Sequence, residues 1–184
     1  FTRITRLSFE QLQKLVSDEW QRNNTDLLSP GEDDTGRTTA EIIQDEVNDP
    51  ARCAALAQQF GISALLNRRF KYLSTGETRK TLLCQALMST PDLLILDEPF
   101  DGLDVASRRQ LAELLDELHQ AGLTLVLVLN RFDEIPEFVQ FAGVLADCTL
   151  TETGAKIDLL QQALIAQLAH SERLEGIQLP EPDE

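Results

Sequence analysis

The sequence predicts an α/β fold in which a parallel sheet is packed against helices. Two apolar runs without polar alternation, residues 93–96 and 124–129, are typical of strands buried on both faces. Between these runs lies a helical pattern that begins at Asp104 and ends at Gly122. A strand, a helix and a strand in this order form a parallel pair with a right-handed crossover. The chain of 184 residues, 42% of them hydrophobic, is long enough to bury a sizeable core.

The N-terminal elements are predicted from local patterns. Residues 1–8 are expected to form a core strand, and apolar residues at helical spacing predict a helix from Ser8 to Arg22. Residues 23–37 are rich in Asn, Asp, Gly, Ser and Pro, a composition typical of a loop. The chain is therefore expected to leave the sheet and enter a helical region.

Two further helices are predicted from their caps. Thr38 and Glu41 have the spacing of a capping box and predict a helix that runs through Val47. Asp49, which precedes a proline, predicts the start of a third helix that ends at Gly61.

The C-terminal region is predicted to contain a hairpin and one more helix. Residues 142–153 are expected to form the short hairpin, and Ala155 to Glu175 has leucines spaced along one helical face. Residues 176–184 contain two prolines and three acids, which is typical of a linker.

Composition argues against several classes of function. A formal net charge of −15 argues against a broad basic face for nucleic acid and against an anionic membrane surface as a direct partner. No run of about 18 apolar residues is present, so direct insertion into a membrane is not expected. The three cysteines, Cys53, Cys84 and Cys148, lack CxxC spacing and indicate neither disulfides nor a metal site.

Two adjacent acids follow the first apolar run. Asp97 and Glu98 come directly after residues 93–96, and ligands of parallel sheets bind at the carboxyl ends of the strands. Asp97 suits a ligand for Mg²⁺, and Glu98 suits a base that activates a water molecule. The alternative is a strand that simply ends in solvated charges.

A second motif, LSTGE at residues 73–77, precedes an apolar helical pattern. Ser74 and Glu77 have capping-box spacing, and Gly76 would let a ligand approach the backbone closely. A helix N-terminus favours an anion such as phosphate. The alternative is an ordinary capped helix. The segment is locally basic, with Arg68, Arg69, Lys71, Arg79 and Lys80.

Together these motifs resemble those of the ATP-binding cassette (ABC) ATPases. LSTGE resembles the family signature LSGGQ, with Thr75 and Glu77 as departures. LLILDE, at residues 93–98, resembles the Walker B strand, and its order and distance of about twenty residues from the signature also fit. The resemblance implies ATP and Mg²⁺ as ligands, Asp97 as the metal ligand and Glu98 as the catalytic glutamate. It also implies that Asp104 belongs to the D-loop.

The glycine-rich P-loop of this family, GxxxxGK[ST], has no match in the sequence. The resemblance therefore implies the C-terminal part of an ABC ATPase domain, with a RecA-like parallel-sheet core, a missing P-loop half and a helical signature lobe. The chain is expected to be a piece of a longer protein and inactive alone. The expected divisions are a partial nucleotide-binding domain at 1–175, with a helical lobe at 9–72, a core at 73–154 and a C-terminal helix at 155–175, and a linker at 176–184.

Two positions depart from the family pattern. Phe9 stands where the resemblance places the Q-loop glutamine, and a phenyl ring cannot coordinate a metal. Asn130 stands where it places the switch histidine, and asparagine cannot hold a positive charge or move a proton. Both departures favour a slow or degenerate site, whereas Glu98 favours an active one. Glu77 is expected either to be neutralised by neighbouring basic residues or to turn back to its cap.

In this family two cassettes pack head to tail. The resemblance therefore implies that the signature residues Ser74, Thr75, Gly76 and Glu77 serve the site of a second cassette, while Phe9, Asp97, Glu98 and Asn130 serve the local site. Residues 95–108 and 125–140 most resemble a tandem-cassette branch associated with molybdenum (molybdate) transport. A membrane permease and a cytoplasmic location, peripheral to the inner face of the plasma membrane, are also implied. The alternatives are a non-hydrolysing regulatory cassette and a soluble non-transport ABC protein.

Overall fold

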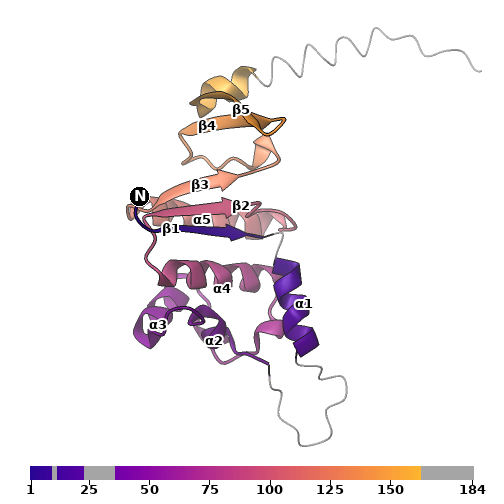
Figure 1. Cartoon of the computed structure of the whole chain (residues 1–184), viewed down its shortest axis with the longest axis vertical. Helices are drawn as coiled ribbons and strands as arrows, with labels where there is room; N and C mark the ends of the chain where they lie inside the picture. The colour runs from indigo at the N-terminus through magenta and orange to yellow at the C-terminus, as the bar shows by residue number, and fades with distance from the viewer. Residues whose placement is uncertain (10–11, 23–35, 163–184) are drawn as a thin grey trace, which may run out of the picture. The chain divides into compact units, whose positions relative to one another are not determined.

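A computed structural model of the chain describes residues 1–9, 12–22 and 36–162 (Figure 1). Most of the predicted loop at 23–37, the end of the predicted C-terminal helix and the predicted linker lie outside these residues. The chain divides into two compact units, Phe1–Asn130 and Arg131–Glu184, which are considered separately.

The first unit contains a three-stranded parallel sheet. Its strands are β1 (Ile4–Ser8), β2 (Leu93–Asp97) and β3 (Thr124–Val128), in the order β1-β2-β3. The register aligns Ser8 with Asp97 and Asp97 with Val128, so all three strands end at the same edge (Figure 1). The predicted α/β fold with a parallel sheet is confirmed.

Helix α5 (Val105–Gln120) connects β2 to β3 as predicted. Asp104 caps its N-terminus, and Gly122 adopts a φ of +98° just beyond its end, in the left-handed region that glycine enters easily. The buried side of α5 is formed by leucines: Leu111, Leu114, Leu115 and Leu118.

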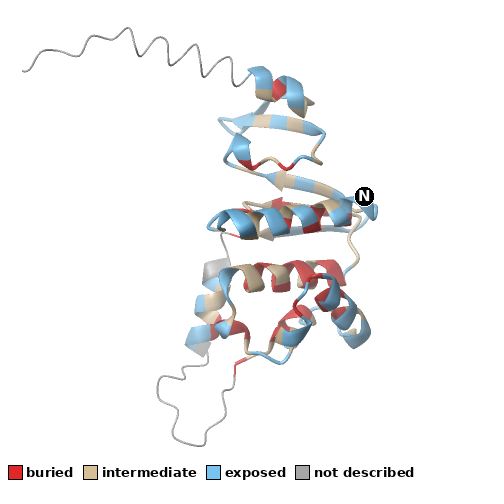
Figure 2. Cartoon of the chain, turned by 180° about the vertical axis from the view of Figure 1, so that it is seen from behind, coloured by how far each residue is buried: buried red, intermediate tan, exposed pale blue. Residues whose placement is uncertain are grey.

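Helix α4 (Thr75–Met88) forms the centre of the first unit. Figure 1 shows it between the sheet and helices α2 (Thr39–Ile43) and α3 (Pro50–Gln59), and α4 contacts β1 as well as both of these helices. Figure 2 shows buried residues along its length. Because α4 is enclosed by other elements, even polar side chains such as Thr78, Arg79 and Thr81 are buried on it.

The helical lobe differs from the prediction in two boundaries. The first helix, α1 (Leu12–Arg22), begins after Ser8, because Ser8 is still paired with Asp97 in the sheet. Helix α2 ends at Ile43 and does not run through Val47, because Gln44 leaves the helical conformation with ψ near 8° and the Asp45 amide bonds to the Ile42 carbonyl, three residues back, at 3.3 Å. Two short 3₁₀ helices, η2 (Ser63–Leu65) and η3 (Phe70–Tyr72), complete the lobe.

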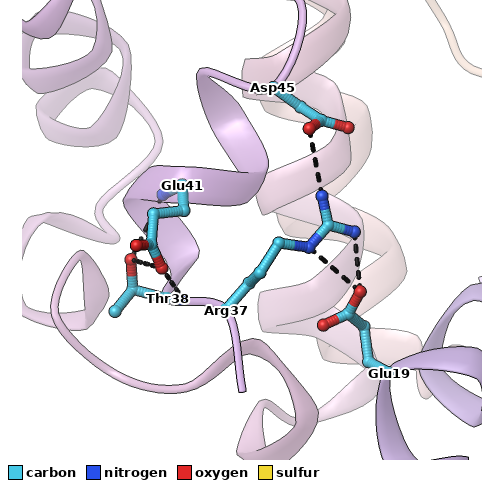
Figure 3. A network of polar contacts seen from close by, with 5 residues as sticks. All are labelled: Glu19, Arg37, Thr38, Glu41 and Asp45. Atoms are coloured by element: carbon cyan, nitrogen blue, oxygen red, sulfur yellow. Dashed lines mark hydrogen bonds and ion pairs between the residues drawn. The ribbon is translucent and has the colours of Figure 1, made fainter. Parts of the chain in front are cut away.

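The predicted caps of the lobe are confirmed. Thr38 and Glu41 form the capping box of α2 (Figure 3). Asp49 caps α3 by accepting a hydrogen bond from the Arg52 amide at 3.0 Å. Gly61, with a φ of +67°, follows the end of α3.

Arg37, which precedes α2, pairs with two carboxylates, that of Glu19 on α1 and that of Asp45 just after α2 (Figure 3). Its Nη2 and Nε atoms lie 2.6 Å and 3.0 Å from Glu19 Oε1 on α1, and its Nη1 lies 3.0 Å from Asp45 Oδ1. The Glu19 side chain is only 2% exposed, whereas that of Asp45 is 52% exposed. The buried carboxylate of Glu19 is thus stabilised by a charge-assisted pair of hydrogen bonds.

The second unit contains a 3₁₀ helix, η4 (Phe132–Glu134), and an antiparallel hairpin of β4 (Phe141–Ala146) and β5 (Thr149–Ala155). The predicted hairpin at 142–153 is confirmed. Residues 156–162 are helical, which agrees with the described part of the predicted C-terminal helix. Across the described parts of both units, no helix is long and apolar enough to cross a membrane.

Candidate functional site

Predicted site residues gather where the parallel strands end. The Phe9 amide donates to the Asp97 carbonyl at 3.1 Å, and the Glu98 amide donates to the Val128 carbonyl at 3.0 Å. These bonds extend the strand pairing by one residue and hold Phe9, Asp97 and Glu98 at the shared edge. Asn130 is exposed and follows the end of β3 after one intervening residue. The fold therefore places these four residues at or next to one edge of the sheet.

Asp97 ends β2 with its carboxylate already paired. Arg6 Nη2, on the neighbouring strand β1, lies 2.8 Å from Asp97 Oδ2, and the Asp97 side chain is 24% exposed. Among the described residues, no group of three or more His, Cys, Asp or Glu could enclose a metal ion. A single carboxylate suits Mg²⁺ that is held mainly by substrate phosphates and water, and it does not suit a metal enclosed by protein.

Glu98 has an unusual backbone conformation. Its φ of +53° lies in the left-handed region, which residues with a side chain rarely adopt. Such a conformation costs on the order of 1–3 kcal/mol and persists only where the surroundings hold it. Glu98 starts the turn that joins β2 to α5, and we refer to residues 97–104 as the acidic turn.

Arg79 holds the acidic turn from the side of α4. Its Nη1 donates to the Pro99 carbonyl at 2.6 Å and to the Glu98 carbonyl at 3.3 Å, and its Nη2 donates to the Asp101 carbonyl. The Arg79 side chain is buried, with 5% of its residue surface exposed. Burial lowers the pKa of its guanidinium, while the nearby Asp101 carboxylate raises it. The charge of arginine persists under such conditions, so these carbonyls compensate a buried cation.

Phe9 covers the other side of this guanidinium. The Arg79 Cζ atom lies 4.8 Å from the centroid of the Phe9 ring, a distance suited to a cation–π contact. The Phe9 residue is 4% exposed. The position that lacks the expected glutamine thus forms part of the packing around Arg79.

The structure places Arg79 against the acidic turn, a position that the sequence did not predict for it. The sequence signal was weak: Arg79 precedes the fully buried Leu83 by one helical turn, so both lie on the same face of α4. A basic residue on the apolar face of a predicted helix requires acceptors from elsewhere in the fold. Its acceptors here are backbone carbonyls, which no side-chain pattern identifies.

The signature-like residues lie at the N-terminal end of α4. The Ser74 hydroxyl accepts from the Glu77 amide at 3.3 Å, and the Ser74 amide donates to Glu77 Oε2 at 2.7 Å. These bonds to Ser74 lower the pKa of Glu77, with smaller contributions from Arg68 and Lys80. The Glu77 side chain thus turns back to its cap, which was one of the two outcomes expected for it.

A cavity of about 370 Å³ adjoins this helix end. Its lining on the α4 side comes from Ser74, Gly76, Glu77, Arg79 and Lys80. The rest of the lining comes from the 61–65 segment, from Leu103 of the acidic turn and from α5. Ser74 and Thr75 are exposed, whereas Glu98 does not line this cavity. The signature-like residues and Glu98 thus lie at separate positions, while Arg79 adjoins both the cavity and the acidic turn.

Asp104 serves as the cap of α5. Its carboxylate accepts from the Ser107 amide at 2.9 Å and from the Ser107 hydroxyl at 2.8 Å. These hydrogen bonds, that of the amide first, lower the pKa of Asp104. Its carboxylate has a structural task in addition to any role in a D-loop.

A sequence model of the family described as ABC transporter matches residues 5–101. Over its 184 residues the chain is 87% identical to the ABC transporter ATP-binding protein ModF of Escherichia coli (strain K12), and the match covers all of this chain and 38% of that protein. It is also 37% identical over 102 residues to the energy-coupling factor transporter ATP-binding protein EcfA2 of Streptococcus sanguinis (strain SK36), covering 55% of this chain and 37% of EcfA2. The chain thus spans less than half the length of these relatives.

Solved structures share the fold. CbiO1 from Clostridium perfringens, part of the ABC transporter complex cbiONQ, aligns with a TM-score of 0.65 at 18% identity, over 95% of this chain and 68% of that chain. At such identity the likeness concerns the fold alone. The family is identified by the match of the sequence model, which covers more than half of the chain. The chain therefore belongs to the ABC transporter family of ATP-binding proteins.

Proposed function

We propose that the chain is part of an ATP-hydrolysing module in which Asp97 and Glu98 form the chemical centre. One observation supports this most strongly: both residues stand at the carboxyl end of the central parallel strand, where Glu98 is held in a left-handed conformation. Strained residues concentrate at functional sites because the strain fixes a reactive side chain in place.

In this proposal Asp97 contacts the Mg²⁺ that accompanies ATP, and the ion neutralises phosphate charge. Glu98 accepts the proton of the attacking water as a general base. Asn130 donates an amide hydrogen bond toward the γ-phosphate in place of a histidine. Phe9, in the glutamine position, contributes packing and no polar contact.

The exposed signature-like residues serve a second cassette. Ser74, Thr75 and Gly76 offer a hydroxyl pair and an open backbone at a helix N-terminus, which suits the phosphates of a nucleotide bound across an interface. Glu77 remains directed toward its own cap, and Asp104 contributes the D-loop. The division of the chain proposed here is a partial nucleotide-binding domain at 1–175 followed by a linker at 176–184.

We propose that the module is one cassette of a tandem-cassette protein and that this protein supports the transport of molybdenum compounds. This rests on the resemblance of residues 95–108 and 125–140 and on the 87% identity to ModF. A membrane permease is the proposed further partner, at the inner face of the plasma membrane.

A second candidate is a regulatory cassette that binds ATP and hydrolyses it slowly or not at all. The ion pair between Arg6 and Asp97 favours it, because Arg6 competes with a metal ion for the same carboxylate. Phe9 and Asn130 favour it as well, since neither supplies the polar group that the family pattern has there.

Steady-state ATP hydrolysis by the natural protein that contains this sequence distinguishes the two candidates. Glu98→Gln removes the base and keeps the side-chain size, so an active local site should slow by about a hundredfold or more. Glu113→Gln is the matched control and should keep the wild-type rate, because Glu113 is an exposed glutamate on α5 that pairs with Arg109. An unchanged rate in Glu98→Gln, with nucleotide binding intact, would establish the regulatory candidate.

A further inference from the structure

Arg79 occupies a position where three separate parts of the first unit meet. It lies on α4, its guanidinium donates to carbonyls of the acidic turn, and its Cζ atom lies 4.8 Å from the ring centroid of Phe9, just after β1. An arginine has five N–H donors in a rigid planar fork, so it can hold several acceptors in a fixed arrangement. Its contacts therefore fix the acidic turn relative to both α4 and β1.

The backbone of Glu98 is held on both sides. Its amide donates to the Val128 carbonyl at 3.0 Å, and its carbonyl accepts from Arg79 Nη1 at 3.3 Å. The next carbonyl, that of Pro99, accepts from the same Nη1 at 2.6 Å. A glutamate with a positive φ needs such restraints, because without them its backbone would prefer a conformation with a negative φ. Without Arg79, the restraint from the α4 side would be lost.

We propose that Arg79 is a positioning residue for Glu98: it holds the acidic turn so that the Glu98 carboxylate stays in its productive place. This rests on the proposed role of Glu98 as the base. Arg79 itself is directed at backbone carbonyls, so it acts on the reaction through Glu98. Phe9 supports it by covering the guanidinium and excluding water from it.

The test uses kcat and KM for ATP in the natural protein that contains this sequence. Arg79→Gln should lower kcat by about tenfold to a hundredfold, since small misplacements of a reacting group have effects of this size. KM should change less than about threefold, because the hydrogen bonds that are lost are those to the backbone of the acidic turn. Arg79→Lys keeps the charge but lacks the planar fork, so its kcat should lie between those of the wild type and Arg79→Gln.

The matched control is Arg52→Gln. Arg52 also donates to a carbonyl of α4, that of Leu87 at 2.6 Å, but at the opposite end of the helix from the acidic turn. Arg52→Gln should lower the thermal stability of the protein without lowering kcat. If Arg79→Gln does not fold, Arg79→Lys beside Arg52→Lys gives the same comparison.

A double variant separates positioning from general damage. If Arg79 acts through Glu98, Arg79→Gln should lower the rate no further once Glu98→Gln is present. Additive losses would overturn the proposal, and so would a normal kcat in Arg79→Gln while Glu98→Gln alone is slow. An unchanged rate in Glu98→Gln alone would overturn the proposed function, and the positioning role with it.

Discussion

The left-handed conformation of Glu98 predicts an inverted preference between alanine and glycine at this position. Both Glu98→Ala and Glu98→Gly remove the carboxylate, so their difference reports on the backbone alone. The left-handed conformation costs a residue with a Cβ about 1–2 kcal/mol and costs glycine almost nothing. Glycine in turn loses about 0.4–1 kcal/mol more conformational entropy on folding. With φ at +53°, glycine should be favoured by about 1 kcal/mol.

Calorimetric melting of the natural protein without nucleotide tests this difference. An advantage of about 1 kcal/mol raises the Tm of a domain of this size by roughly 2–4 °C. Thr90, with a φ of +50°, should show the same preference for glycine, whereas Asp101, whose φ is not positive, should prefer alanine. If alanine is at least as stable as glycine at Glu98 while Thr90 still prefers glycine, the backbone restraint at Glu98 is refuted.

Two ion pairs give further predictions about stability. Hydrogen bonds from the Arg3 side chain and nearby amides lower the pKa of Asp92 to about 2, so its contribution exists above about pH 4 and is lost as the pH falls toward 2. Asp92→Asn should therefore lower urea midpoints at pH 7 but match the wild type near pH 2. Glu19→Ala should cost about 1.5–3 kcal/mol by removing the charge-assisted hydrogen bonds to Arg37, whereas the exposed Asp45→Ala should cost less than about 1 kcal/mol. Equal costs in the two variants would contradict the burial of Glu19.

The sequence predicted those features whose causes lie within a few residues. The capping boxes at Thr38 and Ser74 and the helix starts at Asp49 and Asp104 were all correct, because a cap depends on a side chain and an amide two or three residues apart. The parallel sheet was predicted because apolar runs such as residues 93–96 reflect burial on both faces. Local chemistry and burial pattern were sufficient for these features.

Contacts between distant residues could not be predicted. Arg37 pairs with Glu19 on α1, 18 positions away, and the pair between Arg6 and Asp97 joins residues 91 positions apart. The acceptors of Arg79 are backbone carbonyls, which every residue has, so no sequence pattern distinguishes them. These contacts depend on which elements become neighbours after folding.

The contacts of Phe9 change how its departure from the family pattern is interpreted. From the sequence, a phenylalanine in place of glutamine indicates a lost polar contact and favours a degenerate site. In the structure the same ring covers Arg79, which in turn holds the carbonyl of Glu98. The substitution therefore removes one possible ligand contact but adds support to the residue proposed as the base. For this reason, the activity of the local site should be inferred from what holds Glu98, and not from the number of family positions that are matched.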